Sequence, residues 1–108
     1  MPRLLYRVVK TNPPTVEDFE SHVALGKAPM SADPVKRRMA EGVSVYATLN
    51  QARRNARSFP GHGRYIAELI IPDGAALTIA RTGRQPGHHT IWGDAAEILR
   101  YAASAVPV

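Results

Sequence analysis

Three stretches of this sequence carry side chains whose chemistry would suit a single ligand. They supply a cation from Arg7, hydroxyl groups from Ser44, Tyr46 and Thr48, and a late carboxylate from Glu97. A guanidinium holds phosphate oxygens through paired, charge-assisted hydrogen bonds. Hydroxyl and carboxylate oxygens can bind the hydroxyl groups of a sugar. The set therefore favours a ligand that contains both phosphate and ribose.

Each of these groups also has an ordinary structural role to weigh against chemistry. Arg7 could be an edge-strand arginine that reaches solvent or pairs with a carboxylate. Glu97 could be an exposed helix residue that pairs with Arg100, three positions further on. Tyr46 could be a core residue, and Thr48 matches a helix cap because Gln51 follows it by three residues.

The elements that must position these groups follow from hydrophobic periodicity and turn residues. Strands are predicted over residues 3–10, 43–47, 65–71, 76–80 and 88–92. Helices are predicted from Thr15 to a C-terminal stop at Gly26, over residues 34–40 behind an Asp33 cap, and over residues 49–59, with a loop at residues 27–33. Pro72-Asp73-Gly74 is a turn signal, so the strands on either side of it are expected to form a hairpin.

The end of the chain has two interpretations. Asp94 could cap a helix that runs through Ala103, or residues 98–108 could form a strand. The choice matters for Glu97, because a strand facing Arg7 would support a shared site and an exposed helix would remove it. The overall order predicts one α+β domain over residues 1–108, with a small mixed, partly antiparallel sheet and two or three short helices.

Composition narrows the functional classes. There is no cysteine, and hence no disulfide or thiolate site, and no apolar run approaches the roughly 20 residues that span a bilayer. We expect a cytoplasmic protein with no membrane partner. Fourteen Lys and Arg against nine Asp and Glu give a charge of +5, and eleven of the fourteen are arginine, which favours an anionic partner.

The histidines and the glycine-rich loop give weaker signals. His88 and His89 are adjacent on a predicted strand and point to opposite faces, so they cannot chelate one ion together, and no metal site is expected. One of the two, His88 or His89, could instead line a pocket beside Trp92. The glycines at residues 83–87 have neither Walker nor dinucleotide-fold spacing, so this segment is interpreted as a loop beside the pocket.

The order of the motifs resembles the ADP-ribosyltransferase-like fold, and within it the arginine–serine–glutamate toxins. Those proteins carry a Tyr-Arg pair on the first strand, as in Tyr6-Arg7, and then a Ser-Thr-Ser strand, where residues 44–48 here read Ser-Val-Tyr-Ala-Thr. An Ile-Pro-x-Gly turn follows, similar to residues 70–74 with one inserted position, and then a glutamate before aliphatic residues, as at Glu97.

This resemblance implies NAD as co-substrate, cleavage of its nicotinamide–ribose bond, and transfer of ADP-ribose to an unknown acceptor, protein or nucleic acid, or to water. It implies that Arg7 anchors phosphate and that Glu97 stabilises the positive charge of an oxocarbenium-like transition state. The nicotinamide and ribose site would be shaped by Ser44, Tyr46 and Thr48. His88, the candidate pocket histidine, is expected to help bind the same ligand, although the resemblance does not assign it.

Two departures from that pattern bear on the acceptor. The middle motif is not Ser-Thr-Ser, and Ala95 stands where transferases that modify arginine or glutamine side chains have Glu or Gln. The alternative from another class is a non-catalytic basic module that binds nucleic acid or an acidic protein through Arg53, Arg54 and Arg57. A relic of the same fold that acts as a scaffold is a third possibility.

Overall fold

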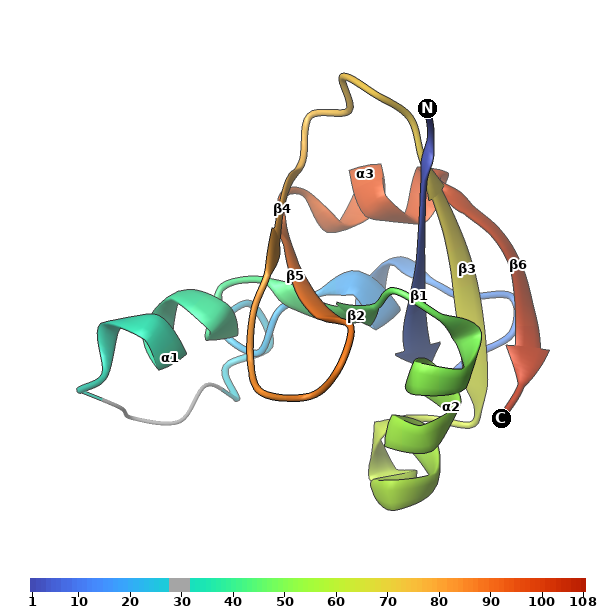
Figure 1. Ribbon diagram of the computed structural model, residues 1–108, viewed down its shortest axis with the longest axis horizontal. Helices are drawn as coiled ribbons and strands as arrows, with labels where there is room; N and C mark the ends of the chain where they lie inside the picture. The colour runs from blue at the N-terminus through green and yellow to red at the C-terminus, as the bar shows by residue number, and fades with distance from the viewer. Residues whose placement is uncertain (28–31) are drawn as a thin grey trace.

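The computed structural model describes residues 1–27 and 32–108, so the middle of the predicted 27–33 loop lies outside the described residues. Within this part of the chain, six strands form one sheet in the order β4-β5-β2-β1-β3-β6 (Figure 1). The strands are β1 (Arg3–Val9), β2 (Val43–Tyr46), β3 (Tyr65–Ile71), β4 (Thr78–Arg81), β5 (His88–Trp92) and β6 (Ala102–Pro107). Every strand pair is antiparallel, so the sheet is not the mixed sheet that the sequence predicted. The predicted α+β class is confirmed.

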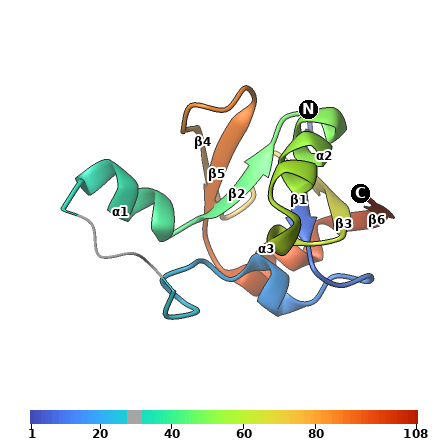
Figure 2. The ribbon, with the colours of Figure 1, turned by 90° about the horizontal axis from the view of Figure 1, so that it is seen from below.

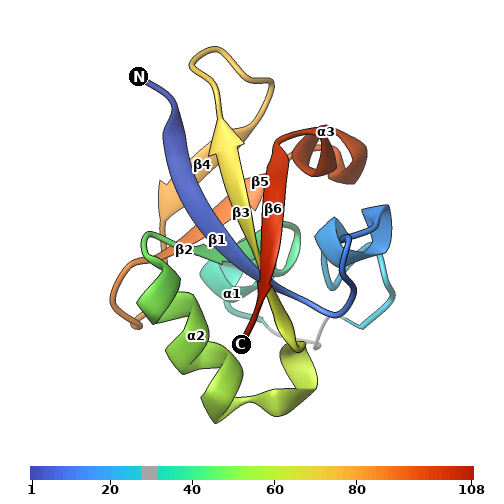
Figure 3. The ribbon, with the colours of Figure 1, turned by 90° about the vertical axis from the view of Figure 1, so that its right-hand side faces the viewer.

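The described residues form the helices α1 (Pro34–Ala40), α2 (Leu49–Ser58) and α3 (Ala95–Arg100), with short 3-10 turns η1 (Val16–Phe19) and η2 (Pro60–His62). The sheet is covered by η1 and α3 on one face and by α2 on the other, whereas α1 buries none of its residues. One core cluster packs η1 and α3 against Leu5 and Val9, and the other packs α2 against Val8 and Ile66 (Figure 3). Successive strand residues point to opposite faces, so Arg7 shares the η1 and α3 face with Leu5 and Val9.

The sheet is divided in its centre. β1 pairs with β3 along its whole length, and β2 pairs with β5 along its whole length, but β1 and β2 share only the pair Tyr6–Tyr46. Beyond that pair the two strands separate, and the half formed by β4, β5 and β2 runs obliquely across the half formed by β1, β3 and β6 (Figure 3). A gap flanked by strand backbone therefore opens beside Arg7.

Local signals place two helices where the sequence predicts them. The Asp33 side chain accepts a hydrogen bond from the Val35 N–H at the start of α1. Thr48 and Gln51 form the predicted capping box of α2, with the Gln51 N–H donating to Thr48 Oγ1 at 3.1 Å. Both caps satisfy N–H groups that the first helical turn leaves unpaired.

The predicted hairpin between residues 65–71 and 76–80 is wrong. The turn at Pro72–Gly74 forms, with Gly74 at φ +80°, but the chain then crosses to the opposite edge of the sheet. There β4 forms a hairpin with β5 through residues 82–87. β3 instead lies between β1 and β6, because β6 supplies its second backbone partner.

Two further boundaries differ from expectation. The helix predicted from Thr15 shortens to the four residues of η1, since Glu20 is already extended at ψ 139°. At the end of the chain both alternatives are realised in succession, with α3 followed directly by β6. Glu97 therefore lies on a helix.

Candidate functional site

A pocket of about 450 Å³ occupies the gap between the two halves of the sheet. One wall comes from the end of β1, Arg7 to Lys10, and another from Gly42 to Ser44 at the start of β2. The segment around η1 and the end of α1 form further walls, and Asn55 and His62 contribute from α2 and η2. Ligand pockets in proteins are commonly of this size.

Arg7 is the central charged group of this pocket. Its Nε donates to the carbonyl oxygen of Asp18 at 2.7 Å, and its Nη1 donates to the carbonyl oxygen of Ser44 at 2.7 Å. A guanidinium has five N–H groups, so the contacts given for the described residues leave part of the donor fork available to a ligand. Burial lowers the pKa of Arg7 to about 10, so Arg7 is still charged at neutral pH.

The loop after β1 is organised by Asp18. Its carboxylate accepts hydrogen bonds from the backbone N–H groups of Lys10 and Thr15, at 2.8 and 2.9 Å, and from the hydroxyl of Thr11. Burial alone would raise the pKa of Asp18, but these hydrogen bonds, with the charge of Arg7, outweigh it and hold the pKa below its ordinary value. The ionised carboxylate thereby fixes the backbone carbonyl that orients Arg7.

The charge around the pocket is mixed. Cationic or imidazole groups come from Arg7, Lys10, His22, Lys27 and His62, and carboxylates come from Glu17, Asp18 and Glu20. Asp18 is fully engaged by the loop, whereas Glu20 is partly buried and the described residues give its side chain no hydrogen-bond partner. The pocket thus offers fixed positive charge together with a carboxylate.

Tyr46, like Asn55, lines both this pocket and a smaller one of about 120 Å³. Its ring is almost fully buried, 5% exposed, and meets the edge of His88 at 5.4 Å between ring centroids. Its hydroxyl donates to Gln85 Oε1 at 2.7 Å, and burial raises its pKa. Tyr46 therefore lines the pocket from a fixed position.

Of the other site residues predicted from the sequence, Ser44 lines the main pocket, whereas Thr48 and His88 line neither pocket. Ser44 lines the main pocket, is exposed, and also supplies the carbonyl that receives Arg7. Thr48 caps α2 and does not line either pocket. His88 is buried behind Tyr46, with its Nδ1 within 3.1 Å of Thr82 Oγ1, and it too lies outside both linings.

Glu97 is not brought to Arg7. It lies on α3, where its carboxylate accepts hydrogen bonds from the Tyr101 hydroxyl at 2.6 Å and from Arg100 at 3.2 Å. Neither pocket includes it. The arrangement matches the structural alternative, an ion pair with Arg100, and its expected catalytic role stays a prediction that this geometry does not support.

The three arginines of α2 do not present one uniform face. Arg53 donates to the carbonyl of Pro107 at 3.4 Å, Arg54 lines the smaller pocket, and Arg57 is exposed. An anionic partner on this helix would therefore meet Arg54 and Arg57 first.

Sequence reasoning missed Asn55 and His62. Asn55 is 8% exposed and lines both pockets. His62 lies on η2, where its Nδ1 is 3.1 Å from Asn55 Oδ1. The sequence holds only a weak signal for Asn55. This polar residue follows the buried Ala52 by three positions and adjoins the buried Ala56, so it lies toward the buried side of α2.

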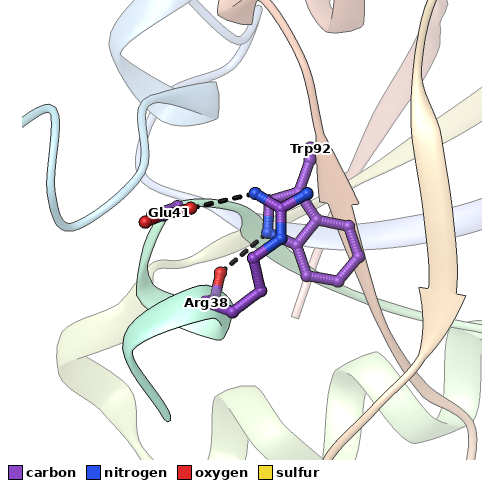
Figure 4. A network of polar contacts seen from close by, with 3 residues as sticks. All are labelled: Arg38, Glu41 and Trp92. Atoms are coloured by element: carbon purple, nitrogen blue, oxygen red, sulfur yellow. Dashed lines mark hydrogen bonds and ion pairs between the residues drawn. The ribbon is translucent and has the colours of Figure 1, made fainter. Parts of the chain in front are cut away.

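One wall of the pocket depends on a contact outside it. α1 buries none of its residues and projects away from the sheet (Figure 2), yet its last residues, Met39 and Ala40, line the pocket. Trp92 Nε1 donates to the Arg38 carbonyl at 2.7 Å, and the Arg38 guanidinium lies 4.5 Å from the ring centroid while pairing with Glu41 (Figure 4). This contact anchors α1 to β5.

Comparison with protein-family models, with curated proteins and with solved structures finds no match for this chain. No helix within residues 1–27 and 32–108 is long and apolar enough to cross a membrane. The same described residues hold no cluster of three or more His, Asp or Glu side chains arranged to bind a metal ion.

Proposed function

We propose that the pocket between the two sheet halves binds a phosphate-bearing nucleotide, with NAD as the ligand, and that Arg7 contacts its pyrophosphate. The observation that supports this most directly is the partly free guanidinium of Arg7 inside a pocket of ligand size. Two backbone carbonyls hold the fork in place, so little side-chain entropy is lost when an anion binds. Ser44 and Tyr46 lie at the same pocket.

The reaction belongs to the same proposal. The resemblance to ADP-ribosyltransferases implies cleavage of the nicotinamide–ribose bond, with ADP-ribose passing to an acceptor or to water. This chemistry benefits from a fixed carboxylate near the developing positive charge. Glu97 is the carboxylate that the resemblance assigns, whereas Glu20 is a partly buried carboxylate at the pocket that, unlike Asp18, has no hydrogen-bond partner among the described residues. The geometry favours binding over cleavage, and the two carboxylates provide separate tests.

The experiment measures NAD binding and nicotinamide release for the wild type, Glu97→Gln and Glu20→Gln. Release that is lost in only one of the variants would identify the acting carboxylate. Binding without release from any of them would limit the domain to nucleotide binding and contradict the cleavage step. A folded wild type that binds neither NAD nor ADP-ribose would contradict the whole proposal.

If the folded wild type binds neither NAD nor ADP-ribose, the alternative function becomes the better candidate, a non-catalytic basic module that binds nucleic acid or an acidic protein. Single-stranded nucleic acid would then be the probe, titrated at several salt concentrations. Replacing Arg54 and Arg57 together by Gln should lower the affinity and the salt dependence under that alternative. Under the nucleotide proposal, NAD binding should survive the same double substitution.

A further inference from the structure

A chain of hydrogen bonds joins four residues, of which Tyr46, Asn55 and His62 line the main pocket and Gln85 lines the smaller one. Tyr46 Oη donates to Gln85 Oε1 at 2.7 Å, and Asn55 Nδ2 donates to the same oxygen at 3.4 Å. Asn55 Oδ1 then faces His62 Nδ1 at 3.1 Å. Because the Asn55 amide nitrogen is directed to Gln85, its oxygen is the acceptor for His62.

This chain sets the tautomer of His62. An Nδ1 that donates to an amide oxygen carries the proton, so the neutral ring presents Nε2 as a lone-pair acceptor. Among the described residues Nε2 has no hydrogen-bond partner, and His62 lines the pocket that contains Arg7. The ring is therefore oriented, and in its neutral form it can accept a hydrogen bond from a ligand.

The ring of His62 is exposed and has an aromatic neighbour. It stacks on Phe59, which is also exposed, with 5.2 Å between centroids and 19° between planes. The next residue, Gly63, approaches the carbonyl of Val9 so closely that a Cβ would overlap it. These contacts hold η2 against the end of β1 and so place the imidazole at the same pocket as Arg7.

We infer that His62 is a hydroxyl-recognition residue of this pocket, accepting a hydrogen bond through Nε2 from a sugar hydroxyl of the ligand, and that Asn55 is its positioning residue. The inference rests on the proposed nucleotide function and adds the second recognition element. Arg7 would bind the phosphates, and His62 would distinguish a sugar-bearing ligand from a bare phosphate.

The surroundings of His62 favour the neutral form of its ring. Burial lowers its pKa, and so do the neighbouring imidazole of His22 and the positive charges of Arg7 and Lys10. Lys27 and the carboxylates of Glu17, Asp18 and Glu20 complete the titratable groups along the pocket. The net lowering keeps the imidazole neutral at physiological pH, which an acceptor role requires.

The test compares two ligands of equal charge. ADP-ribose carries the pyrophosphate diester and the sugars, whereas dimethyl pyrophosphate carries the same two charges without a sugar. Both are titrated by NMR into the wild type, His62→Leu and the control His89→Leu, whose histidine lines neither pocket. His62→Leu should weaken ADP-ribose binding about three- to tenfold, the loss of one hydrogen bond, and leave dimethyl pyrophosphate binding unchanged. His89→Leu should not change the ratio of the two affinities.

A second variant tests the positioning role of Asn55. Asn55→Asp keeps the acceptor for Nδ1 but adds a negative charge, which raises the pKa of His62. The ratio of ADP-ribose affinity to dimethyl pyrophosphate affinity falls when Nε2 is protonated, so this fall should occur at a higher pH in Asn55→Asp than in the wild type. A structural role alone would not shift this profile.

The outcomes separate this inference from the function on which it rests. Equal ADP-ribose affinity for the wild type and a folded His62→Leu would overturn the role of His62 and leave nucleotide binding intact. An equal loss for both ligands would also overturn it, because His62 would then act on phosphate or on folding. Failure of the wild type to bind either ligand contradicts the proposed function itself.

Discussion

Arg7 Nη1 donates a hydrogen bond to the carbonyl oxygen of Ser44 at 2.7 Å, across the gap where β1 and β2 cease to pair. A strand carbonyl that would normally accept from a neighbouring strand accepts from a side chain instead. The guanidinium thus bridges the two halves of the sheet and faces the pocket between them. Arg7 is therefore a structural link between the two halves as well as the proposed ligand-binding residue, so the folding of each Arg7 variant must be measured together with its ligand affinity.

The low pKa of Asp18 predicts an acid-sensitive loop. Its folded pKa lies below the unfolded value near 3.8, so its stabilisation is complete above that value and is lost as pH falls through the folded pKa. Asp18→Asn should lower the urea midpoint at pH 7 and have a smaller effect at pH 3. Glu17→Gln, at an exposed position beside it, serves as the control. An equal loss for Asp18→Asn at both pH values would show that charge is not the cause.

The lowered pKa of His88 predicts a second pH dependence of folding stability, at higher pH than that of Asp18. Burial lowers its pKa below the ordinary 6.5, so the fold favours the neutral ring. Stability is therefore complete above about pH 6.5 and falls as pH drops from there through the folded pKa. His88→Gln should flatten this part of the profile, with a remainder from His62, whose pKa is also lowered. An unchanged slope between pH 7 and pH 5 would contradict this account.

Gly87 holds the loop after β4 against the cap of α2. It has φ +73°, and a Cβ there would overlap the side-chain amide of Gln51. Gly87→Ala should cost about 1–2 kcal/mol from backbone conformation alone, with more from the disturbed cap. Gly61→Ala is the matched control, because a Cβ at Gly61 meets nothing within 4 Å. Similar thermal midpoints for the two variants would refute this packing.

The contact between Arg38 and Trp92 predicts a local effect on α1. A helix of seven residues needs tertiary contacts to persist. Arg38→Ala removes the cation–π contact and the pair with Glu41, at a cost of about 0.5–1 kcal/mol. Amide exchange in residues 34–40 should accelerate in Arg38→Ala and not in Arg37→Ala, which lies on the same helix. Equal exchange in both variants would show that the contact does not anchor α1.

Local sequence signals predicted the elements well where the stabilising groups are close in sequence. Thr48 with Gln51, and Asp33 before Pro34, form hydrogen bonds within three residues, so their helices could be inferred directly. The hairpin after Ile71 was wrong because strand pairing is settled by distant partners. β6, more than 30 residues later, takes the edge of β3 that a hairpin would have used.

The site residues fall into the same two groups, those that a local sequence pattern indicates and those that only the three-dimensional fold reveals. Arg7 could be predicted as a lone charge in an apolar run, and Ser44 and Tyr46 because they share a strand. Asn55 and His62 reach the pocket through the packing of α2 and η2, which no local pattern reveals. Thr48 and Glu97 were grouped with them by motif order, and His88 as a candidate pocket histidine. The fold instead gives Thr48 a helix cap, His88 a buried contact and Glu97 an ion pair.

The central claim is tested most directly by titrating NAD into the wild type, Arg7→Gln, Arg7→Lys and Arg57→Gln, with NMR spectra that also report folding. Loss of charge-assisted hydrogen bonds should weaken binding to Arg7→Gln by at least about tenfold. Arg7→Lys, which keeps the charge but loses the fork, should fall between it and the wild type. Arg57→Gln should bind as the wild type does, and the shifted resonances should include Ser44 and Tyr46. Wild-type affinity in folded Arg7→Gln and Arg7→Lys, or a wild type that binds no NAD, would contradict the account.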